Sequence, residues 1–241
     1  MAEKNRLRLN RAGTIINMTS TQQESTLGQA LKQVMLTIGD DFQLKLHHRK
    51  NWTLQGIVDS LRADFPDIDF YDPSPGTYMS PDGGILSIQS KDGIFHPILI
   101  SEVKNQGTND LRAAEGKKKQ AKGNAIERLG KNVIGLRAAM LSEAIVPFVC
   151  FGYGVDFEVG SSILDRVATI AMFGRLNEVN VLNLGDGGRF NRGSFFFREK
   201  AWGVEEMTEI MTDIATRSIH YYFAKHGPGA FEKDDFLAKD V

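Results

Sequence analysis

The chain has 241 residues, 41% of them hydrophobic, which suffices for one complete core, so we expect a single domain over residues 1–241. Its net charge of −1 excludes nucleic-acid binding through a general positive charge, so any such surface has to be local. The single cysteine excludes an internal disulfide and a zinc site built on several thiolates, and it suits a reducing cytoplasm. The longest apolar run, residues 144–151, is far shorter than the roughly 20 residues that span a bilayer, so we expect no membrane association.

The N-terminal quarter predicts an arm, two helices and a strand. Residues 1–22 show no secretory signal and are expected to form a flexible arm. Apolar residues at three- and four-residue spacing predict an amphipathic helix over 23–38, and alternation predicts a strand over 42–46. Thr53 is the expected N-cap of a second helix that ends at Arg62.

The next segment predicts a loop followed by a β-hairpin. Residues 69–84 are rich in Pro, Gly, Asp and Ser, as loops are. Strands are expected at 85–90 and 96–103, joined through the Asp92-Gly93 pair. The second strand is almost entirely apolar and is expected at the centre of a sheet. Residues 105–122 are polar and basic, and we expect DNA to order them.

The rest of the chain continues the alternation of helices and strands. Helices are expected at 125–143, 163–173 and 204–224, strands at 146–151, 179–184 and 194–198, and a flexible tail at 226–241. Strands that interleave with helices predict an α/β fold.

Two carboxylates and a lysine are expected to meet at the hairpin. Asp82 precedes its first strand, and Glu102 and Lys104 end its second. Two carboxylates suit Mg²⁺, which activates a bound water and neutralises charge on a phosphate, and a lysine can orient that water. Glu102 and Lys104 share one face of the strand, while Val103 points into the core and offers its carbonyl to the metal.

This pattern also occurs by chance. Paired charges at the end of so apolar a strand nevertheless need a reason, which favours a nuclease site.

A second pattern starts the helix after the basic loop. Asn124 followed by Glu127 is typical of an N-terminal capping box. That interpretation leaves Arg128 unexplained, because the helix dipole disfavours a cation in the first turn. A helix end in the DNA major groove would use all three, since Asn binds adenine, Glu accepts from amino groups and Arg donates to purines.

Basic residues surround this helix start. They outnumber the acidic residues between 112 and 137, and they are Arg112, Lys117, Lys118, Lys119, Lys122, Arg128, Lys131 and Arg137. A charge run is usually a solvated face, but its place between the two candidate sites favours phosphate contacts.

These motifs resemble those of the EcoRI family of type II restriction endonucleases. The stretches Pro81-Asp82-Gly83-Gly84, Glu102-Val103-Lys104 and Gly123 to Arg128 occur in the same order, and the likeness extends over residues 25–220. The resemblance implies the PD-(D/E)xK fold, a restriction-endonuclease-like central mixed sheet of five strands flanked by helices. It also implies a homodimer on palindromic DNA, because the symmetry of the protein mirrors that of the site.

Carried over by position, the resemblance implies a role for each motif residue. Asp82, Glu102 and the Val103 carbonyl would hold Mg²⁺, and Lys104 would be the catalytic lysine. Asn124, Glu127 and Arg128 would read an inner AATT, and Ala121 and Gly123 would present backbone groups to the bases. The full set of expected base-reading residues is Gln120, Ala121, Lys122, Gly123, Asn124, Ala125, Glu127, Arg128 and Arg166. Apart from the resemblance, we expect contacts to the DNA backbone from Arg49, Lys50, Asn105, Gln106, Lys117, Lys118, Lys119 and Lys131.

The chain also departs from the family pattern. The loop between Lys104 and Gly123 is shorter, Gln120 stands in place of a methionine, and Lys122 stands in place of an alanine. These positions lie near the outer base pair, so GAATTC is not assumed. The reading stretch is also similar to that of MunI, a restriction enzyme that cuts CAATTG, which ties the stretch to the inner four bases.

The leading hypothesis is therefore a Mg²⁺-dependent restriction endonuclease that cuts double-stranded DNA at a palindrome with an AATT core and leaves 5′ overhangs with 5′-phosphate ends. A host methyltransferase is expected as its counterpart, but not in a stable complex. The alternatives are a structure-specific or repair nuclease of the same fold, and a DNA-binding module without catalysis.

Overall fold

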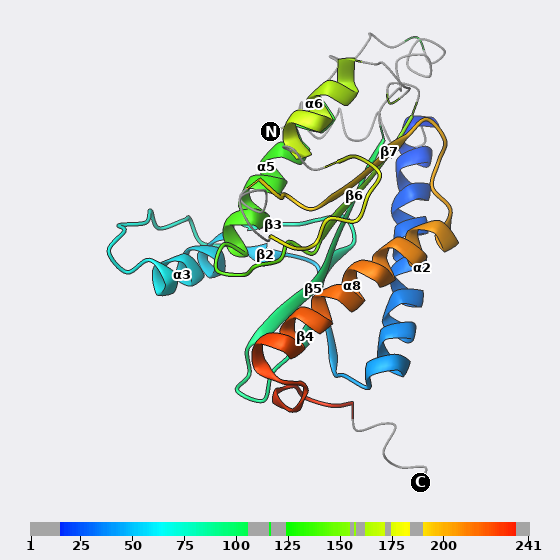
Figure 1. Cartoon of the computed structure of the whole chain (residues 1–241). Coiled ribbons are helices and arrows are strands. Elements are labelled where there is room, and N and C mark those ends of the chain that lie inside the picture. The colour runs from blue at the N-terminus through cyan, green and yellow to red at the C-terminus, as the bar shows by residue number, and fades with distance from the viewer. Residues whose placement is uncertain are drawn as a thin grey trace.

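The computed structural model describes residues 15–105, 116, 124–154, 157, 162–171, 175–183 and 190–234. Their main feature is a mixed five-stranded sheet in the order β1-β4-β5-β6-β7 (Figure 1). Its strands are β1 (Leu46–Arg49), β4 (Gly84–Gln89), β5 (Phe95–Asn105), β6 (Phe148–Tyr153) and β7 (Ser194–Arg198). The first three strands pair antiparallel, whereas β5, β6 and β7 pair parallel. The predicted α/β fold with a central mixed sheet is confirmed.

Helices cover both faces of this sheet (Figure 1). They are α2 (Ile15–Phe42), α3 (Leu54–Asp64), α5 (Asn124–Ala139), α6 (Ser162–Ala171), α8 (Val204–His226) and the short 3₁₀ helix η2 (Pro228–Ala230). A second, two-stranded sheet joins β2 (Trp52–Thr53) to β3 (Tyr78–Met79), next to α3.

The two faces of the sheet belong to two separate cores. Phe148 and Cys150 of β6 pack with α5 and α6, whereas Val149 and Phe151 pack with α2 and α8. Successive side chains of a strand point to opposite faces, so a strand buried on both sides has to be apolar throughout. The unbroken apolar runs of β5 and β6 follow from this position.

The helices differ from their predictions mainly at their ends. α2 begins at Ile15 and so includes residues 15–22, which were assigned to an arm, whereas residues 1–14 lie outside the described part. The predicted N-cap is confirmed, because the Gly56 amide donates to Thr53 Oγ1 over 3.1 Å. α5 ends at Ala139 rather than at residue 143. Beyond it, Tyr221 of α8 donates its hydroxyl to Glu143 and so ties α8 to the segment that follows α5.

The segments at 42–46 and 226–241 were both predicted wrongly in part. The strand after α2 begins only at Leu46, because the Lys45 amide bonds to the Glu232 carbonyl and the Asp234 amide bonds to that of Gln43. The expected tail therefore contributes residues 226–234 to the fold, with Phe231 fully buried. Residues 235–241 are not described.

The strand predicted at 179–184 is wrong for the described residues 179–183. They form an isolated bridge between Leu182 and Ile145 instead of a strand. The side-chain amide of Asn191 donates to the carbonyls of Asn180 and Leu182, which a neighbouring strand would otherwise bind. The side chain of Asn191 thus makes the hydrogen bonds that a neighbouring strand would make. The alternation of apolar residues in the sequence does not reveal such a contact.

Among the described residues, no helix is both long enough and apolar enough to cross a membrane.

Candidate active site

A tight turn places Asp82 against β5. The Gly84 amide donates to the Pro81 carbonyl over 3.0 Å, and the Gly83 amide donates to the Ser101 carbonyl over 2.9 Å. A Cβ on Gly83 would lie 2.0 Å from Ser101 Oγ, and Gly84 has φ +74, which favours glycine. The two glycines therefore allow the turn to approach β5 closely enough for Asp82 to reach it.

The predicted catalytic residues meet at this point. Asp82 Oδ2 accepts from the Val103 amide and from Lys104 Nζ, both over 3.1 Å, and the Asp82 amide donates to Glu102 Oε2 over 3.0 Å. The Lys104 ammonium also donates to Glu102 Oε1 and, over 3.0 Å, to the Val103 carbonyl. The hairpin brings Asp82, Glu102 and Lys104 together as the spacing predicted.

Burial makes this cluster electrostatically strong. Glu102 is 1% exposed, and its burial raises the pKa of the carboxyl, although the Lys104 ammonium acts in the opposite direction. Burial by itself would lower the pKa of Lys104, but the charges of Glu102 and Asp82 outweigh that effect and raise it. The lysine is therefore held in its charged form next to the two carboxylates.

The donor set fits a hard divalent cation. Three oxygens converge on the position of the Lys104 ammonium. They are Asp82 Oδ2, Glu102 Oε1 and the Val103 carbonyl oxygen. Mg²⁺ prefers oxygen ligands and usually keeps several waters, so two carboxylates and a carbonyl are sufficient protein ligands. The described part of the chain has no group of three or more His, Cys, Asp or Glu residues that could hold a metal. The carbonyl is therefore needed to complete the set.

Helix α5 forms the opposite wall of the site. A polar cleft of about 380 Å³ lies between α5 and the carboxylate cluster. The residues that line it are Ser80, Asp82, Glu102, Lys104, Arg128, Lys131 and Asn132. Asn132 Nδ2 donates to Glu102 Oε1 over 3.1 Å, so α5 directly contacts the carboxylate. The apolar face of α5, with Leu129 and Val133, is buried against the sheet. The helix start and the carboxylates therefore belong to one site.

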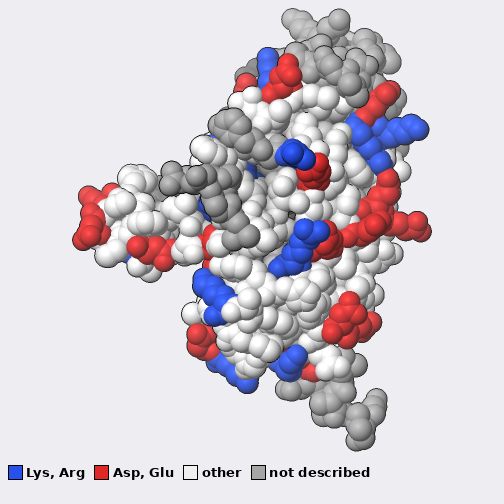
Figure 2. All heavy atoms as spheres, in the orientation of Figure 1, with Lys and Arg blue, Asp and Glu red and all other residues white. Residues whose placement is uncertain are grey.

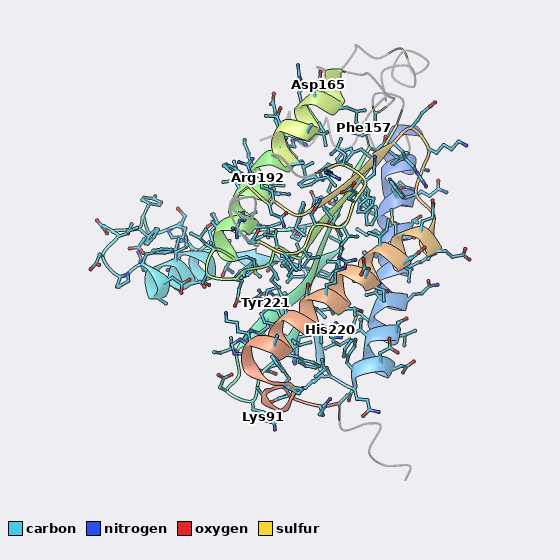
Figure 3. The ribbon with its side chains drawn as sticks, viewed as in Figure 1. Lys91, Phe157, Asp165, Arg192, His220 and Tyr221 are labelled. Atoms are coloured by element: carbon cyan, nitrogen blue, oxygen red, sulfur yellow. The ribbon has the colours of Figure 1, made fainter. Side chains whose placement is uncertain are left out.

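The predicted base-reading residues are only partly described. α5 begins at Asn124, with Ala125 next, and both Glu127 and Arg128 are exposed in its first turns. Arg166 lies on α6, also exposed, and Figure 3 shows the neighbouring Asp165 at the top of the view. Outside the described residues lie Gln120, Ala121, Lys122 and Gly123.

The predicted phosphate contacts are scattered. Lys131 lines the cleft, and Lys50 lines a neighbouring hollow together with Ser80 and Asp82. The Arg49 guanidinium lies 4.4 Å from the centre of the Trp52 ring, where burial lowers its pKa. Asn105 is half-buried, and its side-chain amide donates to Tyr153 Oη. The described residues do not include Gln106, Lys117, Lys118 or Lys119.

Sequence reasoning missed three residues of the site. Asn132 contacts Glu102, and its position four residues after Arg128 was the available signal. His48 Nε2 lies 2.9 Å from the Gly83 carbonyl and supports the turn that carries Asp82. Glu24 of α2 lines the hollow beside Asp82, and burial, followed by the charge of Asp82, raises its pKa. No sequence signal points to Glu24.

Comparisons with known proteins identify a family and two relatives that this chain resembles. The family model described as "Restriction endonuclease EcoRI" matches residues 10–162. The chain is 27% identical over 241 aligned residues to the type II restriction enzyme RsrI of Cereibacter sphaeroides, an alignment that covers 86% of this chain and 87% of that protein. It is 26% identical over 229 residues to the type II restriction enzyme EcoRI of Escherichia coli, covering 80% and 83%.

Proposed function

Because the chain belongs to the EcoRI family of type II restriction endonucleases, and is therefore a site-specific deoxyribonuclease, we propose that it uses Mg²⁺ to cut double-stranded DNA at a palindrome with an AATT core, leaving 5′ overhangs with 5′-phosphate ends. The observation that carries this proposal is that the carboxylate cluster and Arg128, Lys131 and Asn132 of α5 line one polar cleft. A phosphate bound in that cleft would lie next to the cluster while α5 contacts the bases.

The protein groups divide the chemistry between them. Asp82, Glu102 and the Val103 carbonyl are the proposed ligands of Mg²⁺, which, when bound, neutralises charge on the phosphate and lowers the pKa of a coordinated water. The Lys104 ammonium, which Glu102 and Asp82 hold in its charged form, would orient that water and stabilise negative charge on the phosphate oxygens. The Asp82 amide and the Asn132 side chain hold the two oxygens of Glu102 in place.

Sequence recognition is proposed for the start of α5 and the chain before it. The exposed Glu127 and Arg128 support this role, because the ends of long polar side chains at a helix N-terminus can reach base edges in the major groove. The proposed readers are Gln120, Ala121, Lys122, Gly123, Asn124, Ala125, Glu127, Arg128 and Arg166. The proposed phosphate contacts are Arg49, Lys50, Asn105, Gln106, Lys117, Lys118, Lys119 and Lys131.

Charge on the described surface supports an approach of DNA from the α5 side. Figure 2 shows acidic and basic side chains mixed over α2 and α8, whereas the end of the projecting α3 arm is mainly acidic. That arm carries four aspartates in a short stretch, namely Asp64, Asp67, Asp69 and Asp72. Negative charge repels the phosphates of DNA, so the end of this arm is expected to face away from it.

The remaining features follow from a palindromic site. A homodimer presents two identical reading helices and two cleavage sites to the two halves of a palindrome. We place the enzyme in the cytoplasm as a single domain over residues 1–241, with buried Cys150 as a free thiol. The host is expected to need a methyltransferase that protects the same site.

Digestion of sequenced plasmids tests the proposal. With Mg²⁺, we expect discrete fragments whose ends all carry 5′ AATT, and the flanking bases then define the outer pair. Asp82→Ala should stop cutting while it preserves DNA binding, because Asp82 is a ligand and contacts no base in this scheme. Scattered or junction-dependent nicks would instead indicate a structure-specific or repair nuclease, and discrete ends without AATT would reject the assigned reading residues.

A further inference from the structure

The carboxylate of Glu102 is held from two sides. Its Oε2 accepts from the Asp82 amide over 3.0 Å, and its Oε1 accepts from the Lys104 ammonium and from Asn132 Nδ2. The first two donors come from the hairpin that builds the cluster, whereas Asn132 comes from α5. The side chain of Glu102 is 2% exposed, so it exchanges few of these bonds for water.

The contact lies on the same side of α5 as the proposed reading residues. Asn132 follows Arg128 by one helical turn, and residues four apart share one face of a helix. Arg128 and Asn132 accordingly line the same cleft. The opposite face of α5 is buried in the core, where Leu129 is fully covered. A packed helix moves as a unit, so a shift of its start also moves Asn132.

We propose that Asn132 is a positioning residue that couples the fit of α5 on DNA to the orientation of Glu102. When α5 seats correctly on its bases, the amide of Asn132 keeps Oε1 directed toward the cation site after the Lys104 ammonium has left that oxygen. When α5 seats on a wrong base, Asn132 is displaced and Glu102 loses a donor. The inference rests on the proposed functions of Glu102 and of the α5 start.

This coupling predicts that discrimination arises at cleavage more than at binding. Asn132 holds Glu102 and touches no base in this scheme, so its loss should leave metal-free DNA affinity within about threefold of the wild type. Removal of a residue that orients a metal ligand typically reduces metal affinity or activity by about 10- to 100-fold. We expect a reduction of that size in the single-turnover cleavage rate, together with a higher Mg²⁺ concentration at half-maximal rate.

The experiment compares Asn132→Leu, which lacks the amide, with Asn132→Gln, which retains it. Each dimer is tested on the AATT site found by digestion and on a copy with one central base changed. Fluorescence anisotropy without metal gives binding, and single-turnover cleavage gives the rate. The expected result is that Asn132→Leu lowers the cognate rate far more than the rate at the altered site, and that Asn132→Gln restores a large part of the difference.

Two controls separate this role from simpler ones. Lys131→Met removes a neighbouring charge from the same cleft, and we expect it to weaken DNA binding at both sites. The slope of log affinity against log salt concentration should fall by about 1, as for the loss of one phosphate contact. Thermal unfolding of each variant shows whether the fold is intact.

The inference is overturned if Asn132→Leu slows both sites by the same factor, or if it changes neither rate. Failure of the proposed function is a different result, because the wild type would then cut no AATT site at all.

Discussion

Lys104→Met tests the charge balance of the cluster directly. The change removes the ammonium that contacts Asp82, Glu102 and the Val103 carbonyl, and it leaves two carboxylates without their cation. Removing one partner of a buried ion pair lowers the free energy of unfolding by about 3–5 kcal/mol. The lower end applies, because the Asp82 side chain is 27% exposed. In a chain of this size, each kcal/mol of lost stability lowers the unfolding temperature by roughly 2–4 °C. We therefore expect Lys104→Met to unfold about 6–12 °C below the wild type in metal-free buffer.

The same variant should be stabilised by the metal. Mg²⁺ at 100 times its dissociation constant adds about 2.7 kcal/mol, which nearly offsets the loss. The wild type should gain less, because its ammonium already occupies the point on which the three oxygens converge. The assay is thermal unfolding by circular dichroism with a chelator and with excess Mg²⁺, without DNA.

The control is Lys45→Met, which breaks a solvent-exposed pair with Glu232. Such pairs contribute about 0–1 kcal/mol, and Mg²⁺ should not restore this loss. If Lys104→Met unfolds at the wild-type temperature in chelator, or if Mg²⁺ leaves its lower temperature unchanged, the cluster does not hold its charges as described.

Three further changes test the turn, a helix start and the second hollow. Gly83→Ala should cost about 1–3 kcal/mol in urea unfolding, because its Cβ meets Ser101 Oγ, and a second change, Ser101→Ala, should recover part of this. Hydrogen bonds from Arg198 and from the Gly203 amide lower the pKa of Glu206 to about 2, so its stabilisation is present above its ordinary pKa and is lost as the pH falls toward 2. Glu206→Gln should therefore destabilise by up to about 1 kcal/mol at pH 7 and by almost nothing at pH 2. Glu24→Gln should raise the Mg²⁺ requirement of cleavage by roughly tenfold, because it removes negative charge beside Asp82.

A control variant sharpens each of these tests. Gly28→Ala should be neutral or stabilising, because an added Cβ meets nothing within 4 Å on helix α2. Glu205→Gln should not show the pH-dependent loss of stability expected for Glu206→Gln. Asp41→Asn removes an exposed carboxylate from the other end of α2 and should leave the Mg²⁺ requirement unchanged. An equal effect of either carboxylate control would refute the specific contacts assigned to Glu206 or Glu24.

Local patterns determined much of this protein. The apolar runs of β5 and β6 predicted buried central strands, and Thr53 predicted the start of α3, because periodicity and capping depend on residues close together in the chain. The Asp82-to-Lys104 cluster was predictable for the same reason. One hairpin joins its members, so no distant contact is needed to bring them together.

Tertiary structure alone decided the contacts between distant segments. The pairing of residues 43–45 with 232–234 displaced a predicted strand, and the side chain of Asn191 replaced another. The approach of Asn132 to Glu102, and of Glu24 to the hollow beside Asp82, likewise depends on how helices pack on the sheet. Periodicity identifies the face that a helix buries, but the partner of a polar residue on its other face is set by the packing of the whole core.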